Sequence, residues 1–228
     1  MRDPIGCPAG HAIDVDQCGG FVRYVSHMGG DASIVAAARV SYGQPSKGPE
    51  ADRKLLEYLF THKHTSPFEM CKIVYNIRMP IFVQRQFIRH RMQNFNEISA
   101  RYTELPYGFF LPAVWRGQDT KNKQSSMPTD LIDQTECRLD VTRAYDAAYA
   151  CYRRLIKQGV AREQARMVLP VGIYTEFYTC WDLNNLLKYF RLRDDEHAQS
   201  EHRDYAAAMK TIAEAWFPET MDLYTRSL

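Results

Sequence analysis

Several familiar signals are missing from this chain of 228 residues. No apolar run approaches the roughly 18 residues that a membrane-spanning helix needs, and residues 1–16 contain no apolar core of a signal peptide. No GxGxxG or Walker loop occurs, so phosphate binding by a glycine-rich turn is not indicated. We therefore expect a cytoplasmic protein without a membrane segment, in which cationic side chains would hold any nucleotide.

Cysteine pairs and a strong charge of one sign are missing as well. The six cysteines form no CxxC pair, and without an export signal we expect free thiols. Cys7, His11 and Cys18 do not have the spacing of a common metal site, so no metal is expected. The net charge of +2 argues against a general nucleic-acid-binding protein. The chain is 45% hydrophobic and 25% charged, the composition of a globular protein with a substantial core.

What the sequence does contain is a cationic stretch at residues 71–103. It has five arginines and one lysine against a single acid, Glu97, which gives this stretch +5 and leaves −3 for the rest of the chain. The planar guanidinium group suits phosphate and carboxylate. A solvated surface is the simpler interpretation, but the stretch lies between apolar elements and therefore also indicates a cleft for an anionic ligand.

Periodicity predicts both strands and helices. Alternation from Cys71 to Met79 indicates a strand with one buried face, and Pro80 would open a helix to about His90. Val141, Tyr145, Ala148, Tyr152 and Leu155 have the spacing of a helix face. The remaining strands are expected at 21–28 and 173–181. Short helices are expected at 33–40, 52–62 and 162–169, and a long helix from Thr129 or Asp130 to residue 158, which Gly159 ends. Two further helices are expected, one after an N-cap at Asp182 and one from residue 194 onward.

No linker or repeat divides the chain. It is predicted to be one α/β (α+β) domain over residues 1–228 with a helical C-terminal half, and residues 1–20 have no assigned role.

Five sequence blocks occur in a specific order. They are HTSPFE from His64, PIFVQRQFIRHR ending at Arg91, the RHR-x7-S-x-R-Y run from Arg89 to Tyr102, AREQARMVLP and LRDDEHAQSE. A lone Arg-His-Arg would carry little weight, but the ordered set resembles the flavin-dependent thymidylate synthases over roughly residues 36–216.

The resemblance implies a twisted, mainly antiparallel sheet flanked by helices, in a homotetramer with shared active sites. It implies reductive methylation of dUMP to dTMP, with 5,10-methylenetetrahydrofolate giving the carbon and NADPH reducing through FAD. Neither nucleic acid nor membrane is an expected partner.

The same resemblance assigns site residues. The dUMP-binding set is Gln86, Phe87, Ile88, Arg89, Glu97, Ile98, Ser99, Ala100, Arg101, Arg166 and Arg193. The FAD-binding set is Ser66, Arg89, His90, Arg91, Glu97, Asp182, Leu183, Asn184 and Lys188, with His64 and His197 in support.

Arg193 is the predicted catalytic residue. Uracil must gain electron density at C5 to attack a one-carbon unit, and a fixed cation would stabilise the resulting anionic form. The alternative is an ion pair with Asp194, Asp195 or Glu196. For Ser99, phosphate binding is favoured over nucleophilic attack, because no Ser/His/Asp spacing supplies a base.

The sequence departs from the family pattern at three positions: Asn94 replaces a common serine, Asn184 an arginine and Lys188 an asparagine. Two other functions stay open. One is an FAD- and nucleotide-binding oxidoreductase with another substrate. The other is a nucleic-acid-binding module that would stack bases on Tyr75, Phe87, Phe95 and Tyr102.

Overall fold

A computed structural model describes residues 12–43, 45–123 and 125–228. Its centre is a five-stranded antiparallel sheet in the order β1-β2-β3-β7-β4. The strands are β1 (Ile13–Asp14), β2 (Phe21–Met28), β3 (Lys72–Pro80), β4 (Gln93–Glu97) and β7 (Tyr174–Asp182). The predicted fold class, a mainly antiparallel sheet flanked by helices, is confirmed.

Strand β3 shows why the sheet forms. Ile73, Tyr75, Ile77 and Met79 are fully buried on one face, as their alternation predicted. β3 pairs with β7 over its whole length, from Lys72 opposite Asp182 to Pro80 opposite Tyr174. This pairing places the start of β3 beside the N-terminus of the helix that follows β7.

Nine helices lie around the sheet in the described residues. They are α1 (Asp31–Arg39), α2 (Pro49–Thr61), α3 (Ser66–Glu69), α4 (Ile81–Phe87), α5 (Gln134–Lys157), α6 (Arg162–Ala165), α7 (Leu183–Arg193), α8 (Ser200–Trp216) and α9 (Pro218–Arg226). There are also two 3-10 turns, Val40–Tyr42 and Arg166–Val168, and a small hairpin of β5 (Gly117–Gln118) and β6 (Ser126–Met127).

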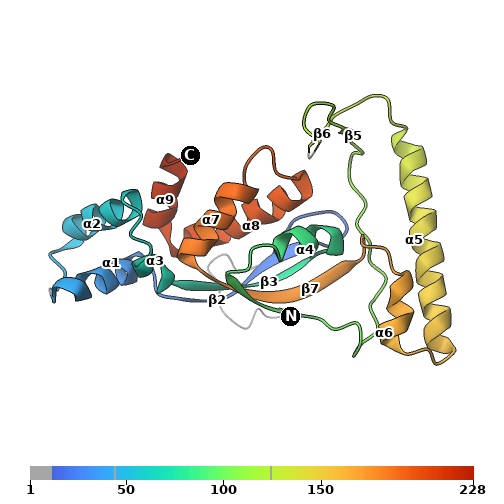
Figure 1. Cartoon of the computed structure of the whole chain (residues 1–228), viewed down its shortest axis with the longest axis horizontal. Coiled ribbons are helices and arrows are strands. Elements are labelled where there is room, and N and C mark those ends of the chain that lie inside the picture. Colours follow the sequence, from blue (N-terminus) through green and yellow to red (C-terminus); the bar gives the residue numbers. More distant parts are fainter. Residues whose placement is uncertain (1–11, 44, 124) are drawn as a thin grey trace.

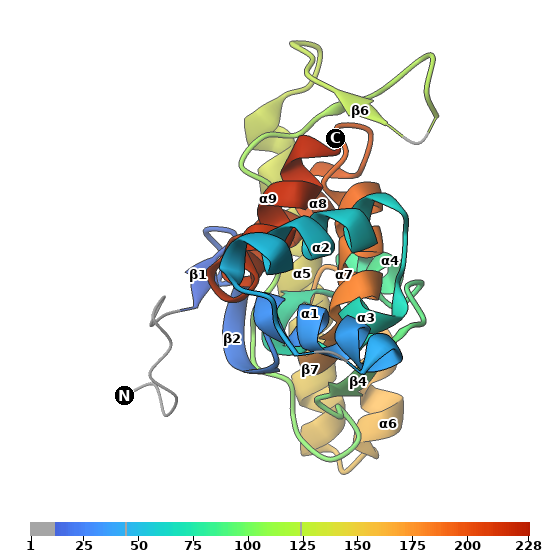
Figure 2. The same ribbon diagram turned by 90° about the vertical axis from the view of Figure 1, so that its left-hand side faces the viewer.

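The helices cover the sheet unequally. α4, α7 and α8 lie over one face, α1 to α3 lie at one end, and α5 stands beyond the other end (Figure 1). Seen from that first end, α1, α2 and α9 lie in front of α7 and the sheet (Figure 2). None of the helices described here is long and apolar enough to cross a bilayer.

Two hydrophobic clusters hold these layers together. The larger joins the buried sheet face to α7, α8 and α9, with Phe87, Trp181 and Tyr189 at its centre. The smaller joins the loop after β4 to α5 through Phe109 and Tyr145, whose rings stack 4.4 Å apart. The predicted stripe on α5 is largely half-buried, since Tyr152 is the only described α5 residue that is fully enclosed.

Two predicted helix starts are wrong. Pro80 is the last residue of β3 and the N-cap of α4, because its ring fixes φ at −68° while ψ of 145° keeps it extended. α5 begins after Asp133, whose carboxylate accepts from the amides of Thr135 and Glu136 at 2.9 Å, and not at Thr129 or Asp130.

Helix ends also differ from the prediction. α4 stops at Phe87 rather than His90, since the chain continues in tight turns through Arg89 and His90. The final long helix starts at Ser200 instead of residue 194, and α9 was not expected. Asp182 does cap α7, because its carboxylate accepts from the Asn185 amide at 2.9 Å.

Candidate functional site

The end of α4 meets the end of α7 in a polar cluster. The Arg193 guanidinium donates from Nε to His90 Nε2 at 3.0 Å and from Nη1 to Gln86 Oε1 at 3.4 Å. The Gln86 side-chain amide in turn donates to Gln199, just before α8. Three predicted residues from two separate sequence blocks are thereby brought into contact: Gln86 and His90 from one block and Arg193 from the other.

The charge of Arg193 has no acidic partner within the described chain. Asp194 pairs with Lys210 at 2.8 Å, Asp195 pairs with His197 at 2.9 Å, and no ion pair among the described residues reaches Glu196. The alternative of an Arg193 ion pair with these acids is therefore wrong. Burial lowers the pKa of Arg193, because its guanidinium is kept partly out of water.

Two histidines behind this cation are kept neutral. Burial, and then the nearby Arg193, lower the pKa of His90 to about 4. Burial likewise lowers the pKa of the fully enclosed His202 to about 3, with Arg193 and His90 contributing. The His202 Nε2 lies 3.2 Å from the Tyr189 hydroxyl. Neutral His90 can therefore accept the Arg193 hydrogen bond and fix the guanidinium in place.

A second group lies at the end of β4. Glu97, Ile98, Ser99, Ala100 and Arg166 line a cavity of about 330 Å³. The Glu97 carboxylate accepts from Gln84 Nε2 at 3.2 Å and from the Thr175 hydroxyl. These bonds fix Glu97 in the wall of the cavity.

The Ser99 side chain is engaged within its own loop. Its Oγ accepts from the Arg101 amide at 3.3 Å, and the Arg101 side chain reaches Glu163 at 3.3 Å. Among the described residues no histidine or lysine is hydrogen-bonded to Ser99, so this chain alone offers it no base.

Helix α4 separates the two groups. Gln84 points to Glu97 and Gln86 points to Arg193, and residues two apart lie roughly 200° apart around a helix. Of the other predicted dUMP residues, Phe87 is fully buried in the core, so only its backbone could meet a ligand, whereas Arg89 and Ile88 are exposed. One chain thus holds the predicted nucleotide residues in two halves.

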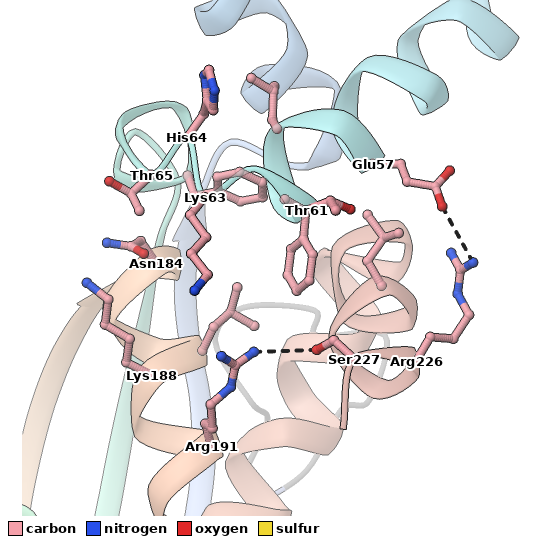
Figure 3. A pocket seen from close by; sticks show the side chains of 15 residues that line it. Glu57, Thr61, Lys63, His64, Thr65, Asn184, Lys188, Arg191, Arg226 and Ser227 are labelled. Carbon is pink, nitrogen blue, oxygen red and sulfur yellow. Dashed lines mark hydrogen bonds and ion pairs between the residues drawn. The ribbon is translucent and has the colours of Figure 1, made fainter.

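A third group surrounds a cavity of about 640 Å³ between α2, α7 and α9 (Figure 3). His64, Asn184 and Lys188 line it, and Ser66 and Asp182 begin the adjoining helices α3 and α7. Asn184 and Lys188, two of the positions that depart from the family pattern, therefore line the same cavity. The Asn184 side chain donates to Glu69 at 3.0 Å.

Other predicted residues lie apart from these groups. Leu183 is buried in the core, and Arg91 is exposed. His197 is exposed, and its backbone amide and ring both lie against Asp195. Cys7 and His11 lie outside the described residues, and no cluster of metal-ligating side chains occurs within them.

The structure adds several residues that sequence patterns did not indicate. Gln199, Tyr189 and His202 support the Arg193 cluster, and Lys63 and Arg191 line the large cavity. The helical spacing of α7 does place Arg191 on one face with Asn184 and Lys188, which line the same cavity. Gln199 and His202 depend on how α8 packs against α4, which periodicity does not reveal.

Comparison with known proteins gives a consistent result. The family model described as "Thymidylate synthase complementing protein" matches residues 23–219. A flavin-dependent thymidylate synthase of Thermus thermophilus is 47% identical over 199 residues, which cover 87% of this chain and 73% of that protein. One of Ehrlichia ruminantium (strain Gardel) is 43% identical over 213 residues, covering 88% and 69%.

A solved structure agrees in fold. It is described as the UMP/dUMP methylase PolB from Streptomyces cacaoi bound with 5-Br UMP, and it superposes with a TM-score of 0.81 at 33% identity. The superposition covers 90% of this chain and 93% of that one.

Proposed function

Because the chain belongs to the flavin-dependent thymidylate synthase family, we propose that it converts dUMP to dTMP. The carbon donor is 5,10-methylenetetrahydrofolate, NADPH is the reductant, and FAD is the bound cofactor. The observation that carries the proposal is the half-buried Arg193 guanidinium, which is held by Gln86 and His90 and lacks an acidic partner in the described chain.

Arg193 acts on the pyrimidine. A uracil ring whose C5 attacks a one-carbon unit carries negative charge in its anionic or enolate-like form. A cation fixed before the reaction stabilises that charge without having to reorganise. Neutral His90 and Gln86 orient the guanidinium and leave its charge available to the substrate.

The phosphate of dUMP is bound by the second group of predicted residues, around the cavity at the end of β4. Arg166 and the loop of Ser99 line one cavity, and arginine forks and backbone amides both suit phosphate. Since Arg193 lies across α4 from this cavity, a complete site takes Gln86, Arg89 and Arg193 from one chain and residues 97–101 with Arg166 from a neighbour. This arrangement supports the homotetramer with shared sites.

The residues fit a flavin dinucleotide. The cavity that His64, Asn184 and Lys188 line has apolar walls and a cationic rim, which suit an aromatic anion. His64, Ser66, Arg89, His90, Arg91, Glu97 and Asp182 to Asn184, with Lys188, would hold FAD. Bound FAD supplies the transfer of reducing equivalents from NADPH. Lys188 restores near the flavin the charge that Asn184 lacks.

A second substrate is suggested by one comparison. The Streptomyces cacaoi protein is described as acting on UMP as well as dUMP. The second candidate function is therefore methylation of UMP.

The test is tritium release from dUMP and from UMP labelled at C5, with the folate and NADPH present. Release from dUMP with formation of dTMP supports the main proposal, and release from UMP alone supports the second. No release from either would reject thymidylate synthesis. A purified protein that is colourless and does not take up FAD would contradict the cofactor assignment.

Arg193→Gln should reduce this release at least about 100-fold, because an electrostatic group acting on the transition state typically contributes that much. Arg154→Gln is the matched control, since Arg154 is an exposed arginine on α5. Equal activity in Arg193→Gln and Arg154→Gln would reject the catalytic role of Arg193 but not the family membership.

A further inference from the structure

The large cavity extends beyond the residues assigned to the flavin. His64, Asn184 and Lys188 form one side of it, while Phe60, Leu223 and Arg191 line the part toward α9. Its volume of about 640 Å³ is larger than a phosphate needs and lies in the range of small-molecule pockets. A second group with an apolar ring and a negative charge would fit this part.

Three cations in the cavity have no acidic partner in the described chain. No described carboxylate lies at ion-pair distance from Lys63, Lys188 or Arg191. Lys188 donates instead to Asn185 Oδ1 at 3.5 Å, and Arg191 donates to Ser227 Oγ at 3.4 Å. By contrast, Arg226 on the rim pairs with Glu57 and Asp222. Lys63 and Arg191 point toward each other across the cavity (Figure 3). Like charges that converge are unfavourable unless an anion lies between them.

The backbone of Lys63 is a second, independent indication. Lys63 has φ of +58° and is the only non-glycine residue with a positive φ in the described chain. It follows the last turn of α2, where its amide donates to Phe60 O and the His64 amide to Leu59 O. Glycine is the residue that best tolerates this position. A lysine there bears a conformational cost, and its side chain enters the cavity.

We propose that the part of the cavity toward α9 binds the adenosine 2′-phosphate of NADPH, with Lys63 and Arg191 on the phosphate and Phe60 and Leu223 against the adenine. The inference rests on the proposed function, in which NADPH is the reductant. A monoester phosphate carries close to two negative charges, which matches two convergent cations. Each phosphate of the FAD diphosphate carries only one negative charge, and a folate polyglutamate tail has no aromatic ring that could pack against the apolar wall.

The test compares purified FAD-loaded wild type with Lys63→Gly, Arg191→Gln and the control Lys54→Gln. Lys54 is an exposed lysine on α2 that pairs with Glu50 and does not line the cavity. The measurements are the dissociation constants of NADP⁺, NAD⁺, 2′-AMP and 5′-AMP by calorimetry, and the FAD content per chain. None of these requires turnover, so they remain informative even if thymidylate formation is not found.

Lys63→Gly and Arg191→Gln should each weaken NADP⁺ and 2′-AMP at least about 10-fold, the usual effect of a lost charged hydrogen bond. NAD⁺, 5′-AMP and FAD content should stay close to wild type, and Lys63→Arg should restore much of the 2′-AMP affinity. Equal weakening of NADP⁺ and NAD⁺ would overturn the 2′-phosphate assignment. Loss of FAD with NADP⁺ affinity unchanged would instead place the FAD diphosphate there. No change in any of the four dissociation constants or in FAD content would also reject the proposal.

Discussion

Two helices of this protein end with the same hydrogen bonds but different residues. At the end of α5, Gly159 has φ of +84°, its amide donates to Ile156 O, and the next amide donates to Leu155 O. At the end of α2, Lys63 makes the equivalent bonds. The left-handed backbone costs roughly 1–2 kcal/mol for a side chain with a Cβ, so Lys63 is the residue that stability alone would not select.

A reciprocal exchange measures this cost. Lys63→Gly should leave the free energy of unfolding unchanged or raise it by up to about 1 kcal/mol, because relief of the left-handed strain exceeds the extra entropy of glycine in the unfolded chain. Gly159→Lys should lower the free energy of unfolding by about 1 kcal/mol, because the lysine has to adopt a left-handed backbone. No steric clash adds to this cost, since nothing lies within 4 Å of the added Cβ. Urea unfolding gives both values. A clear loss of stability in Lys63→Gly would mean that the Lys63 side chain stabilises the fold.

His202 should make the protein sensitive to acid. Its pKa in the folded protein is about 3, below the ordinary value of 6.5, so the unfolded chain binds a proton more readily between these values. The free energy of unfolding therefore falls as the pH is lowered from about 7 toward 4. For a group this deeply buried the loss is on the order of 3 kcal/mol. His90 shifts in the same direction.

Denaturant unfolding at pH 7 and pH 4 tests this contribution. His202→Gln removes the titrating group, so its stability should fall less over this interval than that of the wild type. Parallel losses in both proteins would show that carboxylates, and not His202, dominate acid unfolding.

At the scale of elements, short-range pattern is a sound guide where burial alone decides. The alternation of β3 and the strand β7 follow from side chains that the sheet buries, and the Asp182 cap of α7 follows from a local hydrogen bond to the Asn185 amide. Pro80 misleads because a proline suits both a strand end and a helix start. The contact of Gln86 with Arg193 depends on the packing of α4 against α7, so only the family resemblance, and no periodicity, could place both residues in one site.

The two capped helices differ in what they carry. Asp182 caps α7, which presents Asn184 and Lys188 to the large cavity, and Asp133 caps α5, which bears no predicted site residue. Asp182→Ala and Asp133→Ala should each lower the free energy of unfolding by about 1 kcal/mol. Only Asp182→Ala should also reduce the FAD content of the purified protein.

Thermal unfolding and flavin absorbance per chain give both quantities. Full flavin content in Asp182→Ala would contradict a cofactor role for the start of α7. Flavin loss in Asp133→Ala would mean that flavin content follows stability alone.

At the scale of the whole molecule, a single chain leaves the apolar face of α5 partly uncovered and keeps the predicted dUMP residues in two separate places. Within the described chain, α5 buries only Tyr152 fully and leaves the rest of its apolar face half-covered. The residues predicted for dUMP lie in two groups on different sides of α4. The sequence could indicate the residues of each group. It could not show that α4 separates the two groups, because periodicity does not describe how helices pack in space. A second copy that brings its Ser99 loop to the first copy's Arg193 would resolve both features.

Mixed oligomers test this directly. Arg193→Gln and Arg166→Gln should each be nearly inactive alone, because each removes one half from every site. When the two variants are unfolded together and refolded, some sites combine the intact Arg193 of one chain with the intact Arg166 of another. Random assembly predicts about one quarter of wild-type activity for sites that two subunits share. Wild type refolded in the same way corrects for yield. If the mixture stays as inactive as its parts while both variants assemble normally, each site is built from a single chain, and the separation across α4 must be closed by movement within it.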